Sequence, residues 1–122
     1  LYDEPEFVIR NIWRQFGGWW DGAASRLKPS PDAQLASVVA EMCGGPAELV
    51  RRAQLAVADN DLRLACHLAD LAGWAAPHDP SIHAARAEIY IERRKAEPSL
   101  MSKGIFMAAA RESQLIAQAS TA

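Results

Sequence analysis

The sequence predicts an all-α fold of about six helices, and three observations support this prediction. Alanine and leucine, which lose little conformational freedom in a helix, occur 24 and 11 times among the 122 residues. The β-branched residues that favour strands are scarce, with 5 valines, 7 isoleucines and 1 threonine. Glycine pairs and prolines divide the chain into segments of helical length. We therefore expect one domain, residues 1–122, built from antiparallel helix hairpins.

The first helix is expected over about Glu4–Phe16. Asp3 can cap its start, Pro5 fits the first turn because its missing N–H costs little there, and the glycines at 17–18 end it. With the loop that follows, this helix forms an N-terminal part, 1–29, ahead of a helical bundle at 30–122.

The loop, residues 17–31, has an unusual composition. Two tryptophans, Trp19 and Trp20, stand among three glycines, whereas flexible linkers lack large aromatic residues. We therefore expect both tryptophans to be packed. Asp21 is expected to cap backbone N–H groups of its own turn, with a functional role as the alternative.

Five further helices are expected in the bundle. Ser30 is the expected cap before Pro31, and Asp79 is the expected cap before Pro80. The expected helices span about Pro31–Met42, Pro46–Ala58, Asp61–Ala75, Pro80–Glu97 and Ser99–Leu115. The apolar faces expected for the first and third of these are Leu35, Val38, Val39 and Met42, and Leu64, Leu68 and Leu71 with Ala65 and Ala72.

A repeat of tetratricopeptide length is visible in the bundle. Pro46 and Pro80, which each open a helix, lie 34 residues apart. Small residues occupy the positions where that repeat needs close helix packing: Ala53, Ala65, Ala72 and Ala87. Because only about one and a half units fit, we expect a bundle resembling tetratricopeptide hairpins rather than a true repeat array.

Charge and hydropathy exclude two classes of partner. The net charge of −2 and the pI near 5.9 lack the basic balance of a nucleic-acid-binding protein. The longest stretch without a charged residue is the ten residues of 113–122, too short to cross a bilayer. No basic segment precedes an apolar run, so a soluble chain without a signal peptide is expected, and its compartment stays unknown. The start at Leu1 without methionine suggests a piece of a longer protein.

No motif predicts a catalytic, metal or cofactor site. His67, His78 and His83 have no metal-ligand spacing and are expected to face solvent or to be hydrogen-bonded. Cys43 and Cys66 form neither a disulfide framework nor a zinc motif and are expected to act as small buried residues.

Aromatic residues are concentrated at the N-terminus. Six of the nine fall within the first 20 residues: Tyr2, Phe7, Trp13, Phe16, Trp19 and Trp20. Because aromatic residues dominate interface cores, this cluster favours a contact with another domain or subunit. Ordinary packing of the first helix on its own bundle is the alternative.

Several segments, in order along the chain, resemble alkyl sulfatases of the metallo-β-lactamase superfamily, in the region that follows the catalytic domain. They are EPEFVIRNIWR at 4–14, GGWWDG at 17–22, LKP at 27–29, DLRLACHLA at 61–69, SLMSKGIF at 99–106 and AARE at 109–112. The whole chain resembles the alkyl sulfatase dimerisation domain.

This resemblance implies a zinc-binding hydrolase domain before this region of the parent protein and a sterol-carrier-like domain after it. The parent would hydrolyse alkyl sulfate esters with two zinc ions and an activated water. The helical domain would interlock two subunits as a homodimer, and its N-terminal segment would lie against the catalytic domain near the substrate entrance. Candidate contact residues are then Phe7, Trp13, Phe16, Trp19, Trp20 and Asp21.

The chain departs from that family at specific positions. The metal-binding His-x-His-x-Asp-His run is absent, so this chain itself is expected to bind no zinc and to be no enzyme. Phe16 stands where a tyrosine is frequent, and Ala23-Ala24 stands where Asn-Pro is frequent. The leading hypothesis is a non-catalytic dimerisation module from a zinc-dependent alkyl-sulfatase-like hydrolase. Alternatives are a tetratricopeptide-like peptide-binding module, and a fragment that contacts the parent's substrate through Arg10, Trp20 and Asp21.

Overall fold

The structure is a computed structural model that describes residues 22–119. The chain divides into two compact units, Leu1–Pro31 and Asp32–Ala122, which we describe separately. The expected helix at 4–16 lies outside the described residues.

The described part of the first unit is one short turn. Residues Ala24–Arg26 form a 3-10 helix, η1, in which the amide N of Arg26 donates to the carbonyl of Ala23 at 3.0 Å. Gly22 precedes it with a φ of +86°, a backbone conformation that glycine adopts without strain. The sequence predicts an ordered loop here, and the single helical turn is compatible with that prediction.

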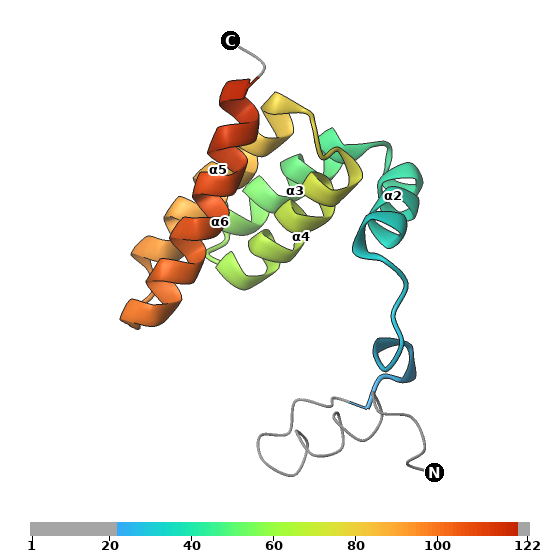
Figure 1. Cartoon of the computed structure of the whole chain (residues 1–122), viewed down its shortest axis with the longest axis horizontal. Helices are drawn as coiled ribbons and strands as arrows, with labels where there is room; N and C mark the ends of the chain where they lie inside the picture. The colour runs from blue at the N-terminus through green and yellow to red at the C-terminus, as the bar shows by residue number, and fades with distance from the viewer. Residues whose placement is uncertain (1–21, 120–122) are drawn as a thin grey trace. The chain divides into compact units, whose positions relative to one another are not determined.

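The described part of the second unit, residues 32–119, consists of five α-helices (Figure 1). No strand occurs within residues 22–119, so the all-α prediction is confirmed. The helices are α2 (Asp32–Cys43), α3 (Pro46–Ala58), α4 (Leu62–Ala75), α5 (Pro80–Lys95) and α6 (Leu100–Ala119).

Local capping explains where these helices begin. The Asp61 carboxylate accepts from the amide N of Leu64 at 3.2 Å and caps α4. The Asp79 carboxylate accepts from the amide N of Ser81 at 3.0 Å and caps α5, where Pro80 takes the first helical position. The expected bounds are nearly right: α2 begins one residue later, at Asp32, and α6 continues past Leu115 to Ala119.

Most helices pack against their neighbours in the chain, but α2 packs mainly against α4. α3 and α4 form a hairpin, α5 packs on both, and α2 packs against α4 and α3 (Figure 1). Among the described helices, α6 packs only against α5. The two end helices, α2 and α6, therefore each keep an open side.

The core is built largely from alanine. The buried apolar residues are Ala36, Ala40, Leu49, Ala53, Ala56, Ala65, Ala69, Ala72, Ile82, Ala87, Ile89, Tyr90 and Ala110. All four small positions of the 34-residue period are among them. Small side chains permit close helix approach, because the distance between helix axes depends on the residues at the contact.

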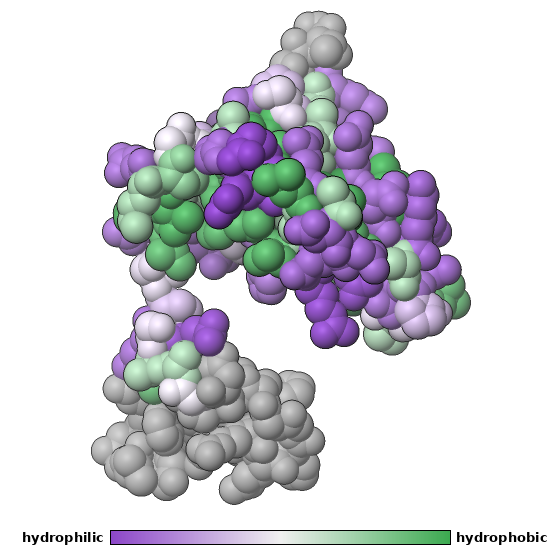
Figure 2. All heavy atoms as spheres, turned by 180° about the vertical axis from the view of Figure 1, so that it is seen from behind, coloured by the Kyte–Doolittle hydropathy of each residue, from purple (hydrophilic) through white to green (hydrophobic). Residues whose placement is uncertain are grey.

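The predicted apolar faces of two helices are partly wrong. In α2 the buried residues are Ala36 and Ala40, whereas Met42 is 82% exposed and Leu35 and Val38 also face solvent. Figure 2 shows apolar side chains gathered at the α2 end of this side of the second unit.

In α4, Leu64 is 47% exposed, while Ala65, Ala69 and Ala72 are buried. Leu68 and Leu71 are half-buried against the core, as expected. The smallest residues occupy the contact because α3, α4 and α5 lie too close together for larger ones.

Candidate functional site

One side of α6 exposes large apolar residues along most of the helix. Leu100 is 86% exposed, Met101 79%, Ile105 63% and Leu115 67%. With the residues between them on the same side, they form what we call the outer face of α6: Leu100, Met101, Gly104, Ile105, Ala108, Arg111 and Leu115. Clustered apolar exposure of this kind marks interaction sites rather than ordinary surface.

A groove runs along α6 and shares five residues with the outer face: Leu100, Gly104, Ala108, Arg111 and Leu115. The groove, of about 680 Å³, is lined by Arg94 of α5 and by residues of α6: Leu100, Lys103, Gly104, Met107, Ala108, Arg111, Glu112 and Leu115. At its middle a Cβ atom added to Gly104 would have no heavy-atom neighbour within 4 Å. The groove therefore offers apolar walls, small central residues and charged groups on its rim.

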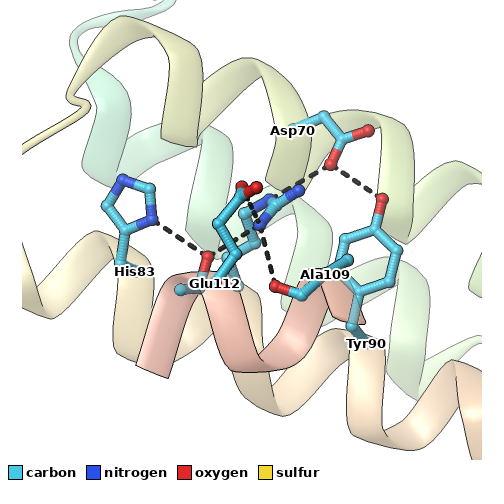
Figure 3. Close-up of polar contacts among 7 residues, drawn as sticks. Asp70, His83, Tyr90, Ala109 and Glu112 are labelled. Carbon is cyan, nitrogen blue, oxygen red and sulfur yellow. Dashed lines mark hydrogen bonds and ion pairs between the residues drawn. The ribbon is translucent and has the colours of Figure 1, made fainter. Parts of the chain in front are cut away.

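The opposite side of α6 is held by a polar network centred on Arg86 of α5. Figure 3 labels its partners Asp70, Ala109 and Glu112. Arg86 Nη1 donates to Ser113 Oγ at 2.7 Å and to the carbonyl of Ala109 at 3.2 Å, both on α6. Its Nε donates to Asp70 Oδ1 of α4 at 3.2 Å. One guanidinium thus joins three helices, and Glu112 Oε1 lies 3.4 Å from Nη1 at the edge of the network.

Tyr90 completes the network toward α4. Its hydroxyl donates to Asp70 Oδ1 at 2.7 Å, and the Arg86 guanidinium lies 4.9 Å from its ring centroid. Burial, followed by the hydrogen bond and charge of Asp70, raises the pKa of the Tyr90 hydroxyl. The Tyr90 ring lies 6.1 Å from the Phe106 ring of α6, so aromatic packing adds to the α5–α6 contact.

His83 is the most enclosed ionisable residue of this region. It is 4% exposed, and its Nδ1 lies 3.0 Å from Ser113 Oγ. A guanidinium can only donate, so Ser113 Oγ accepts from Arg86 and its own hydrogen is available for Nδ1. His83 Nε2 is buried without a hydrogen-bond partner in the described chain. The expectation of a hydrogen-bonded histidine holds here; His67 and His78 are exposed.

The network residues were not found from the sequence, apart from His83. Asp70, Arg86 and Ser113 are separated by 16 and 27 residues and match no motif. In the sequence, each of these three residues is typical of the polar surface of a helix. Only the packing of α4, α5 and α6 brings them together.

A second, smaller groove lies between α3 and α5. It has a volume of about 270 Å³ and is lined by Gln54, Val57, Ala85, Glu88, Ile89, Ile91 and Glu92. Two carboxylates on an otherwise mostly apolar wall could hold a cationic segment.

No metal site forms in the described part of the chain. Across residues 22–119, no three His, Cys, Asp or Glu side chains gather in a way that could hold a metal ion. Burial raises the pKa of the Cys66 thiol, with the Asp70 charge as a further cause, so this thiol is poorly reactive. Cys43 is exposed, which differs from the burial expected for it. Between residues 22 and 119, no helix is long and apolar enough to cross a membrane.

The contact candidates predicted from the sequence lie outside the described residues. These are Phe7, Arg10, Trp13, Phe16, Trp19, Trp20 and Asp21. Their roles at an interface or a substrate entrance stay predictions.

Comparison with known proteins agrees with the fold and with the resemblance. The chain matches the family described as alkyl sulfatase dimerisation over residues 1–115. A solved structure of a double mutant of the sec-alkyl sulfatase PisA1 matches with a TM-score of 0.73 and 21% sequence identity. The match covers 87% of this chain and 17% of that chain. No curated protein matches. With 115 residues matched, the chain belongs to the alkyl sulfatase dimerisation family.

Proposed function

We propose that this chain is a non-catalytic module through which two copies of its protein associate. The observation that carries this proposal is the family match over residues 1–115. The distribution of apolar residues supports it: alanine fills the core, while larger side chains such as Leu100 and Met101 face outward on α6. Burying such side chains between two copies would supply the free energy of association.

We further propose that the parent protein is a zinc-dependent hydrolase of alkyl sulfate esters whose metal pair lies in a separate domain. The family match supports this proposal, as does the likeness to PisA1, of whose chain this chain matches only 17%. The chemistry that such a metal pair supplies, activation of a water, would then belong to that separate domain and not to residues 22–119. The aromatic residues at 7–20 would then pack on that domain or on the partner subunit.

The solution mass of the chain tests the association. Light scattering after size exclusion, across a hundredfold range of concentration, should give twice 13.3 kDa throughout. An interlocked interface is expected to exceed about 2,000 Å², so the dimer should persist at micromolar concentration. A mass of 13.3 kDa at every concentration would contradict the proposal.

The groove between α3 and α5 favours a second candidate function, the binding of a cationic peptide. Glu88 and Glu92 lie on its wall. A fluorescent lysine-rich peptide should then bind, as measured by anisotropy, and Glu88→Lys with Glu92→Lys should abolish binding without changing the mass. Absence of binding to the unchanged chain would remove this candidate.

A further inference from the structure

We propose that the groove along α6, which includes Leu100, Gly104, Ala108, Arg111 and Leu115 of the outer face, is the seam between the two copies. The two α6 helices would pair antiparallel about an axis beside Met107 and Ala108. This inference rests on the proposed self-association and names the surface that performs it.

The residue pattern of α6 is self-complementary. The symmetry centre lies between Met107 and Ala108. A residue a given number of positions before Met107 corresponds to the residue the same number of positions after Ala108. Three residues out lie Gly104 and Arg111, four out lie Lys103 and Glu112, and seven out lie Leu100 and Leu115. Steps of three, four and seven stay on one face of a helix. All eight residues line the same groove.

An antiparallel pair about this axis brings each residue opposite its counterpart. Lys103 of one copy faces Glu112 of the second copy, and the contact occurs twice because a two-fold interface uses the same patch on both copies. Leu100 meets Leu115 at both ends of the seam. Arg111 lies over Gly104 of the second copy, where the absent side chain leaves room for its long stem.

Charge favours this orientation over the parallel one. A parallel two-fold pairing would bring each of Lys103, Arg111 and Glu112 against its own copy, and like charges in contact repel. Glu112 can make the intermolecular pair because its side chain is 67% exposed and, among residues 22–119, its one ion pair is the edge contact with Arg86. Lys103 makes no ion pair within residues 22–119.

No atom of residues 22–119 lies where a side chain at Gly104 would begin. Glycine within a helix lowers helix stability, and here an added Cβ would meet nothing within 4 Å. Gly73 of α4 differs, because there a Cβ would lie 3.1 Å from Arg86 Cδ and 3.4 Å from His83 Cε1. A close approach by a second helix gives Gly104 the structural role that its own chain does not.

The open face of α2 is a poorer candidate for the same partner. It exposes Leu35, Val38 and Met42, but the helix carries two acidic residues, Asp32 and Glu41, and no basic one. Two copies of α2 would therefore bring only like charges together, whereas α6 supplies both signs.

Charge reversal at the seam tests the inference on the 122-residue chain. Lys103→Glu and Glu112→Lys should each weaken the dimer at least tenfold, because each creates two repulsive contacts in its own homodimer. An equimolar mixture of the two variants should dimerise again, since both contacts are attractive in the heterodimer. Lys95→Glu, the same charge change at an exposed position of α5, is the control and should leave the mass unchanged.

The outcomes separate this inference from the proposed function. An unchanged chain that stays monomeric would overturn both. A dimer that persists in both charge variants would overturn the α6 seam and leave the proposed function standing. If each variant dimerises more weakly and the mixture does not dimerise again, the antiparallel register is wrong. Because Glu112 touches the Arg86 network, Gly104→Leu provides a second test. The leucine side chain would meet no atom of residues 22–119 at its Cβ. The variant should therefore be a monomer whose helix content, measured by circular dichroism, is unchanged.

Discussion

The middle of the helical bundle and the outer face of α6 use apolar residues in opposite ways. Between α3, α4 and α5 the buried residues are mostly alanines, among them Ala53, Ala65 and Ala69. On α6 the large residues Leu100 and Met101 are almost fully exposed. The difference teaches that residue size varies with location in this chain: small residues predominate where its own helices approach closely, and several large ones stay exposed on α6, where the proposed association would bury them.

The two sides of α6 extend the comparison. The inner side is fixed by directional bonds from Arg86 to Ser113 and to the Ala109 carbonyl. Such bonds fix the rotation of α6 about its own axis and its position along α5 more tightly than apolar contact alone. The outer face is therefore held in one orientation relative to α5, as the proposed two-fold interface would need.

Removing the centre of the network should have the largest effect on stability. In Arg86→Met, the carboxylate of Asp70 and the hydroxyl of Ser113 lose a charged partner while the surrounding helices keep them largely from water. The Arg86 side chain is only 11% exposed, so we expect a loss of about 3 kcal/mol in the free energy of unfolding, measured by urea denaturation.

Arg51→Met is the matched control. Arg51 forms its ion pair with Glu48 on the open surface of α3, and this change should leave the free energy of unfolding nearly the same. Equal effects of the two substitutions would mean that the network does not fix α6.

Enlarging an interior alanine should have the next largest effect. Ala65→Leu inserts three carbon atoms where the side chain is fully buried between helices, and overpacking of this kind costs about 2 kcal/mol. Its sequence neighbour provides the control, because Leu64→Ala removes the same atoms from an exposed site and should cost less than about 1 kcal/mol. Thermal unfolding of both variants measures the difference. The reverse order would restore the interpretation in which the large residues of α4 form the core.

The sequence predicts the starts of these helices well because capping is local. Asp61 and Asp79 accept hydrogen bonds from amides two or three residues ahead, and Pro80 fits the first turn without any distant contact. Helix type, order and approximate bounds follow from such short-range signals.

The buried faces are harder to predict because Ala65 and Leu64 are both apolar and adjacent. Which of them is buried depends on how closely α3 and α5 approach α4, and the alanines of those helices set this distance. The 34-residue period did identify the close-packed positions, because it registers residue size rather than hydrophobicity. The Arg86 network is invisible to both signals, since its members lie on three helices.

Alkaline pH should weaken the folded chain through Tyr90. Burial and the Asp70 carboxylate raise the pKa of its hydroxyl in the folded state, so the folded protein keeps the proton when the unfolded chain releases it near pH 10. The stabilisation is fully present below pH 10 and is lost above it, by up to about 1.4 kcal/mol for each pH unit. Urea denaturation at pH 9, 10 and 11 should show that the free energy of unfolding falls more steeply with pH for the unchanged chain than for Tyr90→Phe. Parallel curves would place Tyr90 in water rather than in the network.

The two glycines within helices give the smallest and most selective comparison. Gly104→Ala should raise the free energy of unfolding by up to about 1 kcal/mol, because alanine favours the helix and the added Cβ meets no atom. Gly73→Ala should bring no such gain. Its Cβ would lie 3.1 Å from Arg86 Cδ, and Arg86 cannot move aside freely because hydrogen bonds hold its guanidinium on two helices.

Both glycine variants must be measured at concentrations low enough for the chain to be monomeric, since association adds its own stability. If the free energy of unfolding rose equally in both variants, the contact between α4 and α5 would be looser than the distances at Gly73 indicate. If Gly104→Ala stabilises the monomer and also weakens the dimer, then the residue that is worst for its own helix is retained for a second copy. That result would show that the residues exposed on α6 differ from those of the interior because they serve association with a second copy.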